Sequence, residues 1–587
     1  MELSYYKDIA KNLKLSIEGN YKTSRLYTTK RTICFITIVL SVAAAYDFGH
    51  NAFWAVSLIL LAVFIYLIKR HSDIHRIIAY EENKYKITME YVSRFEGSWT
   101  QFPDNGADFF NRNYTQDTDL NILGPASIFQ YCCCARSAEG RATLAKRLKP
   151  YPDTPEALRI HQEETLFFLH NPDAALHLQA INCQTPFNFS VKKLLLYLDN
   201  PENLTDKLFI ISSILPPVSL LLSGAAALGM IPIKLPILLL CLQLAISLIR
   251  QQKNTAAIAP LYKINNGLAY YHQLFSALTA VLPKKIGNID PKELTEAINP
   301  IRNLKNIAIL AELRHNFILF FFLNTFFMWD FQIIRLFHGW QKHHSNRLKL
   351  WLNMWYETET AISLASFGHT GKKAVMPILK ESETPYIKAV NLENPLISQE
   401  TSVPNSIDLV PSLNIITGSN MSGKTTWLRT LATSCILAYA GAPVCADSFE
   451  LSPLNIMTSI RISDDLNTGT STFYAEIKRI KAMITEADTD RPMLTVIDEI
   501  FKGTNSADRI ICAQTALLHL TKPNIITLVS THDFELCHIE PKNNIPINNY
   551  HFEEQIVDDR LLFDYKIKEG PCKTTNAQLL LKLAGIY

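Results

Sequence analysis

Two long uncharged runs constrain this chain more than any other feature of its sequence. Thr32–Tyr46 and Phe48–Ile68 are separated only by Asp47, and a polar turn follows at 49–51. A helix satisfies its backbone hydrogen bonds internally, so paired apolar runs favour a helical hairpin in a bilayer. Basic pairs at 30–31 and 69–70 flank the hairpin and none lies in its turn, which places both outer ends in the cytoplasm.

A second pair of apolar runs repeats this pattern further along the chain. Leu208–Ile233 and Leu235–Ile249 are divided at Lys234 and predict a second hairpin in the inner (cytoplasmic) membrane, with the soluble domains facing the cytoplasm. Buried helical hairpins of a soluble domain remain the alternative for both pairs. Phe317–Trp329 has only thirteen residues, and its length predicts a buried core helix rather than a span.

A glycine-rich motif predicts a nucleotide-binding loop in the last third of the chain. It has the pattern G-x-x-x-x-G-K-T, follows the strand-like run Leu413–Thr417 and precedes the helical run Trp427–Tyr439. Backbone N–H groups of such a loop surround phosphates, a lysine neutralises their charge and a threonine hydroxyl reaches Mg²⁺. The candidate residues are Gly418, Ser419, Asn420, Met421, Ser422, Gly423, Lys424, Thr425 and Thr426.

Two further strand-like runs end in residues suited to ATP hydrolysis. Met493–Ile497 leads into Asp498, a candidate Mg²⁺ ligand with Thr425, and Glu499, a carboxylate able to polarise the attacking water. Ile525–Ser530 ends just before His532, which can reach the γ-phosphate. Strand ends converge in a doubly wound sheet, so we expect an ATPase site with Lys424, Glu499 and His532 as catalytic residues.

A segment rich in small hydroxyl residues lies between these motifs. Residues 463–473 read Ser-Asp-Asp-Leu-Asn-Thr-Gly-Thr-Ser-Thr-Phe and precede a helical run over Tyr474–Thr485. Hydroxyl groups at a helix start form either an anion site or the cap of an ordinary surface helix. The residues alone leave both interpretations open.

Four of these segments, in this order, resemble the ATPase domain of MutS-type mismatch-repair proteins. They are the glycine-rich loop, the Asp-Asp-Leu-x-x-Gly-x-Ser-Thr-Phe segment, the Asp-Glu-Ile-Phe-Lys-Gly-Thr-Asn-Ser run from 498, and Ser-Thr-His-Asp-Phe-Glu-Leu from 530. The resemblance implies an ABC-class homodimer that uses ATP and Mg²⁺. In it, Ser471 and Thr472 close over the partner subunit's nucleotide, Asn505 and Ser506 lie at the seam, and His532 is the switch histidine.

The resemblance is looser upstream. Residues 119–130, 140–148 and the helical stretch Tyr262–Phe367 are similar to the MutS lever. The family's mismatch-reading domain carries a Phe-x-Glu motif, but the matching region of this chain holds the first apolar hairpin. We therefore expect a membrane-associated variant without that reader, and interpret Phe552-Glu-Glu554 as a chance match in a β-hairpin.

Charge gives little guidance about partners, because the net charge is only +3. A basic stretch at His338–Leu350 fits DNA phosphates, anionic lipid or simply a solvated helix face. We expect eleven reduced cysteines, as in a cytosolic protein.

Together these features predict a multidomain chain with an α-helical lever carrying two transmembrane hairpins, followed by an α/β P-loop domain of ABC type. The predicted segments are a leader (1–31), a first hairpin (32–69), an amino-terminal lever segment (70–206), a second hairpin (207–250), a carboxy-terminal lever segment (251–385) and the ATPase domain (386–587).

Two functions fit this organisation. The first is a membrane-tethered ATPase that binds DNA in mismatch repair or recombination, with an unidentified protein partner that reads its ATP state. The second is a nucleotide-gated membrane protein without a DNA role.

Overall fold

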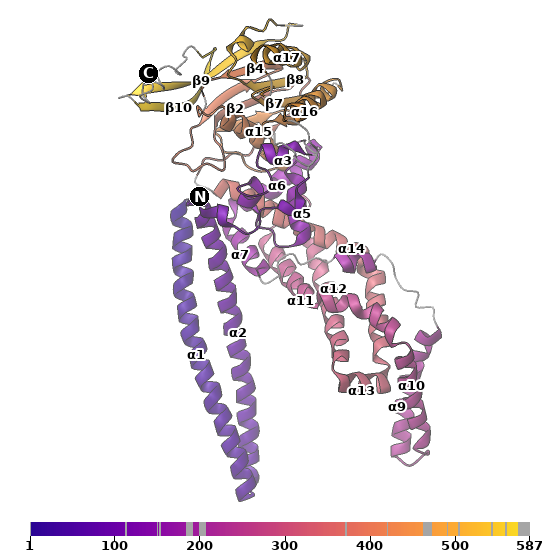
Figure 1. The fold of residues 1–587 in the computed structure, drawn as a ribbon. Coiled ribbons are helices and arrows are strands. Elements are labelled where there is room, and N and C mark those ends of the chain that lie inside the picture. Colours follow the sequence, from indigo (N-terminus) through magenta and orange to yellow (C-terminus); the bar gives the residue numbers. More distant parts are fainter. Residues whose placement is uncertain are drawn as a thin grey trace. The chain divides into compact units, whose positions relative to one another are not determined.

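A computed structural model describes most of the chain (Figure 1). The described residues are 2–111, 114–149, 151, 154–183, 192–198, 207–369, 372–419, 421–461, 472–489, 491–502, 505–541, 544–557 and 560–572. The chain divides into two compact units. Unit 1 comprises Met1–Cys134, Arg141–Pro172 and Thr360–Tyr587, and unit 2 comprises Ala135–Gly140 and Asp173–Glu359.

Unit 1 begins with two long antiparallel helices, α1 (Leu3–Phe48) and α2 (Asn51–Phe95). Gly49 ends α1 with a φ of 64°, a backbone conformation that favours glycine and allows the tight reversal. Near the open end, the rings of Tyr6 and Tyr91 stack with centroids 5.0 Å apart, and the Tyr6 hydroxyl lies 3.0 Å from Nδ1 of His369. Each apolar run therefore forms the turn end of a helix whose other end is polar.

A six-stranded sheet forms the centre of the carboxy-terminal region of unit 1. Its order is β10-β9-β4-β8-β7-β6, and all neighbours are parallel except β9 and β10. The central strands are wholly buried, which explains why their sequences are continuous apolar runs. The bounds are β4 (Ser412–Thr417), β6 (Asn455–Ser459), β7 (Met493–Asp498), β8 (Ile525–Ser530), β9 (Ile547–Val557) and β10 (Arg560–Glu569).

A second sheet of four strands, in the order β1-β5-β2-β3, has no counterpart in the sequence-based prediction. Its strands are short and half-exposed, so they lack the apolar runs that identify the larger sheet. They are β1 (Ile378–Leu379), β2 (Ile387–Leu392), β3 (Asn405–Leu409) and β5 (Ser448–Leu451).

The other helices of unit 1 pack around these sheets. Helix α15 (Lys424–Ala440) is almost entirely buried and shares a core with both sheets. α16 (Thr472–Ala487) and α17 (Ser506–His519) pack with the opposite face of the larger sheet. The remaining helices are α3 (Thr115–Asp119), α4 (Ile128–Cys132), α5 (Ala138–Arg147) and α6 (Pro155–His170).

Unit 2 is mainly helical in its described residues, with one short antiparallel bridge between Ile286 and Ile289. Its helices are α7 (Pro172–Asn182), α8 (Lys192–Leu198), α9 (Lys207–Ala227), α10 (Lys234–Ile249), α11 (Gln251–Val281), α12 (Pro291–Glu312), α13 (Phe317–Phe327) and most of α14 (Trp329–Ala365). Segments of unit 2 that are distant in sequence meet at buried Glu359, which accepts hydrogen bonds from the backbone N–H of Arg136 and the side-chain amide of Asn182. A helical region followed by α/β sheets agrees with the predicted multidomain class.

Among the described residues, three helices are long and apolar enough to cross a membrane, namely α1, α2 and residues 208–227 of α9. Two bent pairs pass the same test only when each is taken as one span. They are α10 with the start of α11, bent by 67°, and α12 through His315 with α13, bent by 111°. The apolar runs of both predicted hairpins thus form helices in the structure.

The prediction that Phe317–Trp329 is a buried core helix is wrong. Phe317 and Ile318 are 75% and 76% exposed, and within α13 itself only Phe320 and Asn324 are buried. The run is short, but short length alone does not place a helix inside a core when its neighbours cover only one face.

Candidate functional site

The glycine-rich loop joins β4 to α15 and so has the strand–loop–helix arrangement that its motif requires. Two glycines are dictated by geometry. A Cβ on Gly418, whose φ is 146°, would lie 2.7 Å from the carbonyl oxygen of Phe552, and Gly423 has a φ of 103°. Neither position accepts another residue without strain, because both combine a positive φ with a close neighbour.

Lys424 folds back over this loop from the first turn of α15. Its Nζ donates to the carbonyl oxygens of Gly418 and Ser419, at 2.7 and 2.8 Å. Burial lowers the pKa of Lys424 from its usual value, although Glu499 and Asp498 oppose this effect. The hydroxyl of Ser422 is also buried and has no hydrogen-bond partner among the described residues. Buried donors at a helix amino terminus suit an anionic ligand.

The carboxyl ends of β7 and β8 bring the acidic residues to this loop. Thr425 Oγ1 donates to Asp498 Oδ2 at 2.8 Å, and the Ser530 hydroxyl donates to Asp498 Oδ1. Hydroxyl and carboxylate oxygens are the ligand type that Mg²⁺ prefers, so Thr425 and Asp498 fit this ion as a pair.

Glu499 follows directly in a left-handed backbone conformation, with a φ of 53°. Its carboxylate lies 3.1 Å from Nε2 of His532 and 2.6 Å from Nζ of Lys502. The pKa of Glu499 is lowered to about 2, mainly by the hydrogen bond from His532 and further by Lys502, against the effect of burial. Glu499 is therefore ionised near neutral pH and can accept a proton or a hydrogen bond from water.

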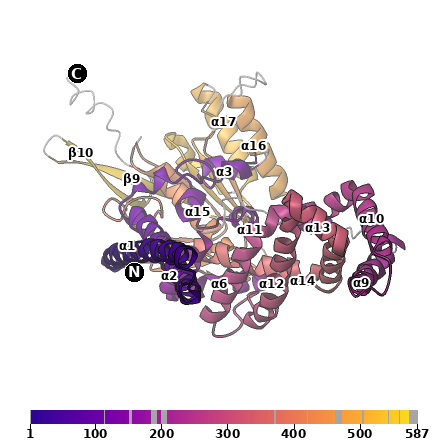
Figure 2. The same ribbon diagram turned by 90° about the horizontal axis from the view of Figure 1, so that it is seen from below.

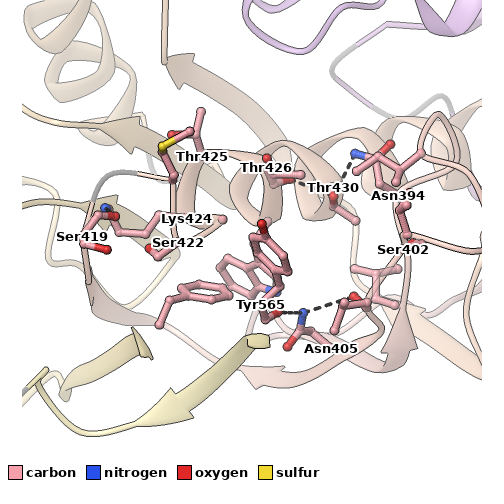
Figure 3. A pocket seen from close by; sticks show the side chains of 18 of the residues that line it. Asn394, Ser402, Asn405, Ser419, Ser422, Lys424, Thr425, Thr426, Thr430 and Tyr565 are labelled. Atoms are coloured by element: carbon pink, nitrogen blue, oxygen red, sulfur yellow. Dashed lines mark hydrogen bonds between the residues drawn. The ribbon is translucent and has the colours of Figure 1, made fainter. Parts of the chain in front are cut away.

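A cavity of about 590 Å³ opens beside the loop (Figure 3). On one side it is lined by the loop, the first turn of α15 and Glu499, and on the other by residues of β3, β10 and the segment after β2. Asn394 donates to Thr430 Oγ1 at 2.9 Å, and Asn405 donates to the carbonyl oxygen of Tyr565 at 2.9 Å. The volume suits a nucleotide-sized ligand.

Most of the predicted site residues meet at this cavity. Its lining includes Ser419, Met421, Ser422, Gly423, Lys424, Thr425, Thr426 and Glu499. Gly418, Asp498 and His532 contact lining residues. Asn420 and Ser471 lie outside the described residues. Thr472 is the first residue of α16, but its side chain is not described.

Several contacts at the site have no counterpart among the sequence motifs. The Glu554 carboxylate on β9 accepts a hydrogen bond from Ser419 in the loop, so Phe552-Glu-Glu554 belongs to the site rather than to an unrelated surface. Tyr565 on β10 packs against Gly423. Lys502, three residues after Glu499, belongs to the run from 498 that carries the resemblance, but the motif alone assigns it no role.

A further contact of this kind is made by Asp119, which is fully buried. Asp119 accepts from Thr458 Oγ1 at 2.8 Å and from the backbone N–H groups of Ile460 and Arg461, both at 3.1 Å. Arg479 on α16 pairs with the same carboxylate at 3.3 Å. Asp119 therefore connects α3, the end of β6 and α16.

The strand–loop–helix geometry and the positions of Asp498 and Glu499 beside the loop are compatible with a bound nucleotide. Residues 414–586 match the family model of MutS domain V. The match supports membership of the MutS family, whose domain V carries the ATPase site. It covers most of β4, the loop, Asp498, Glu499, His532 and the β9–β10 hairpin.

Proposed function

We propose that this chain is a membrane-tethered, MutS-like ATPase that hydrolyses ATP in a composite site of a homodimer and binds DNA. The convergence of Lys424, Thr425, Asp498 and Glu499 at one edge of the sheet carries the proposal. The MutS domain V match supports an ATPase with a relation to DNA.

The site residues have distinct roles in this reaction. Loop N–H groups and Lys424 would hold the β- and γ-phosphates, and Thr425 and Asp498 would hold Mg²⁺, which would neutralise part of the phosphate charge. Glu499 accepts a hydrogen bond from water and orients its oxygen towards the γ-phosphorus. The water oxygen would bond to the γ-phosphorus as the bond from that phosphorus to the β–γ bridging oxygen breaks, and the electron pair of that bond would stay on ADP. One water proton would remain on the phosphate and the other would pass to solvent by way of Glu499. His532 holds the Glu499 carboxylate and would also contact the γ-phosphate.

Ser471 and Thr472 of one subunit complete the partner subunit's site in this proposal. Asn505, which caps α17 by accepting from the N–H of Asp508, lies with Ser506 at the seam. Closure of the dimer then depends on ATP, and a protein partner reads the closed state.

ATP turnover by the full-length protein in detergent tests the site. Lys424→Ala is expected to lose ATP binding, and Glu499→Gln to keep ATP bound and accumulate the closed dimer. Lys388→Ala is the control, because Lys388 is an exposed lysine of the same region of the chain, paired with Asp408. Undiminished hydrolysis in the Lys424 or Glu499 variant contradicts the assignment.

DNA binding is tested separately by fluorescence anisotropy with duplex, branched and mismatched DNA, with ATP or ADP present. We expect binding that weakens with salt, since phosphate contacts release counterions. No salt-sensitive binding in either nucleotide state rejects the DNA role.

One observation favours a second candidate, a nucleotide-gated membrane protein without a DNA role. Arg347, in the basic stretch that fits DNA phosphates, is already paired with Glu293 and Glu296 at 2.7 and 2.5 Å. Under this candidate the apolar helices are essential to function. A variant that lacks residues 32–69 and 207–250 and keeps its biological activity refutes it.

A further inference from the structure

Helix α13 exposes an apolar surface that no described region of unit 2 covers. Residues 316–329 carry no charge, and Phe317, Ile318 and Phe322 are 75%, 76% and 53% exposed. Only Phe320 and Asn324 of this helix are buried. Contiguous exposed apolar side chains of this size mark a surface that is covered in the functional protein.

The two helices that flank α13 run antiparallel to each other. Trp329 Nε1 donates to the carbonyl oxygen of Leu310 at 3.0 Å, and Trp340 Nε1 donates to that of Pro300 at 2.8 Å. The two contacts are ten residues apart on α12 and eleven apart on α14, in opposite chain directions, as expected for antiparallel helices. Figure 1 shows α13 lying across the ends of α12 and α14, after a bend of 111° from α12. The chain therefore enters and leaves α13 on the same side.

The length of α13 excludes a crossing. Its 11 residues span about 16 Å, roughly half the thickness of a hydrocarbon core. A short apolar helix of this kind is either a core helix, which its exposure rules out, or a re-entrant or interfacial segment. The return of α14 beside α12 agrees with a re-entrant segment and not with a broken span.

Helix α13 is continuous with the second apolar hairpin. It packs against α10 and α9, and Figures 1 and 2 both show the three helices together. Leu221 on α9 and Leu238 on α10 are also exposed, at 75% and 67%. Arg335, on α14 about two turns after the end of α13, donates to the carbonyl oxygen of Phe209 at 2.6 Å. This contact holds the start of α9 against α14. The three helices form one apolar surface.

Polar groups border this apolar surface at the two ends of α13. Arg314 and Asp330, at the two ends of α13, form a buried ion pair at 2.9 Å. The Asn316 side chain caps α13 by accepting from the N–H groups of Ile318 and Leu319. Paired charges and a capped amino terminus allow α13 to enter an apolar phase without unsatisfied donors.

We propose that α13 is a re-entrant membrane helix that enters the cytoplasmic leaflet beside the α9–α10 hairpin, with lipid acyl chains covering Phe317, Ile318 and Phe322. The inference rests on the proposed membrane tether. It adds that the lever itself, through α12 and α14, is embedded in the bilayer at its tip.

Photo-crosslinking of the full-length protein in vesicles tests this assignment. Benzoylphenylalanine is introduced singly at Phe317, Phe322, Leu238 and Leu350, and the vesicles contain phosphatidylethanolamine and phosphatidylglycerol with alkyne-tagged acyl chains. Leu350 is the matched control, because it is 45% exposed on α14 but lies about 30 Å along the helix from Trp329.

We expect lipid adducts at Phe317 and Phe322 at least tenfold above those at Leu350, and similar to those at Leu238. Adducts at Leu238 alone overturn the re-entrant helix and leave the membrane tether standing. Adducts at none of the four positions overturn both the re-entrant helix and the membrane insertion of the α9–α10 hairpin. Equal adducts at all four positions also overturn the re-entrant helix, because contact then does not depend on the α13 surface.

Discussion

Asp119 offers the sharpest test of how the helical region of unit 1 positions the nucleotide site. Its carboxylate accepts from the backbone N–H groups of Ile460 and Arg461, directly before the segment 462–472 that ends in the proposed trans residues. Replacing Asp119 with Ala removes both acceptors and breaks the pair with Arg479.

The expected magnitude follows from burial. Asp119 is fully buried, and a buried donor left unsatisfied costs about 1–3 kcal/mol, while breaking a buried ion pair costs about 3–5 kcal/mol. Arg479 is partly exposed and can turn to solvent, so we expect a loss of about 3 kcal/mol of local stability. At about 1.4 kcal/mol per factor of ten, this corresponds to roughly 100-fold faster amide exchange. Asp119→Asn keeps one carbonyl acceptor, so we expect its amide exchange to be only about tenfold faster than in the unmodified protein.

Hydrogen–deuterium exchange read by mass spectrometry on peptides covering 455–461 measures this effect. Asp117→Asn is the matched control, because Asp117 lies on the same helix and is nearly buried but accepts from Asn111 instead. ATP turnover is expected to fall several-fold in Asp119→Ala with ATP affinity unchanged. Unaltered exchange of these peptides in Asp119→Ala would refute the reasoning.

Three further outcomes follow from the site. Glu554→Gln removes a negative charge beside the phosphate loop and should tighten ATP binding about tenfold by calorimetry; Glu553→Gln, whose carboxylate faces Lys568, should not. Thr425→Ala should raise the Mg²⁺ concentration for half-maximal turnover by about 10- to 100-fold, whereas Thr425→Ser should not; equal behaviour of the two contradicts a hydroxyl role. His532→Ala should raise the pKa of Glu499 from about 2 and lower the free energy of unfolding by about 1 kcal/mol. Because the folded pKa is depressed, that difference in stability is present above about pH 4.3 and is lost as pH falls towards 2, as thermal unfolding at graded pH can show.

The strands that carry the site could be predicted from the sequence, because each is a local run of apolar residues. β4, β7 and β8 are buried strands with continuous apolar sequences, and each carries its functional residue at or just after its end. The order of motifs along the chain then placed Lys424, Asp498 and Glu499 together, as found.

Contacts between distant segments could not be predicted in this way. Asp119 contacts residues about 340 positions away, and Asn405 meets Tyr565 160 positions away. No local pattern records such pairs, because they depend on which sheet edge or hairpin the chain returns to. The four-stranded sheet was missed for the same reason, since its half-exposed strands have no strong periodicity.

Helix α13 shows a different limit. Hydropathy and length measured how apolar the run is, but not whether protein or lipid covers it. Whether α13 is covered depends on how α12 and α14 pack, and they meet through contacts between distant residues, such as that of Trp340 with Pro300.

The first two helices have a mechanical consequence. They contain 46 and 45 residues, whereas a bilayer crossing needs about 20. In the proposed membrane tether, the polar section of α1, from Leu3 to Arg31, extends about 40 Å from the hydrocarbon boundary. Because Tyr6 bonds to His369 at the far end, this pair of helices acts as a spacer of fixed length. In the proposed tether, such a spacer holds the proposed ATPase domain at a set height above the membrane and leaves room there for a partner of domain size.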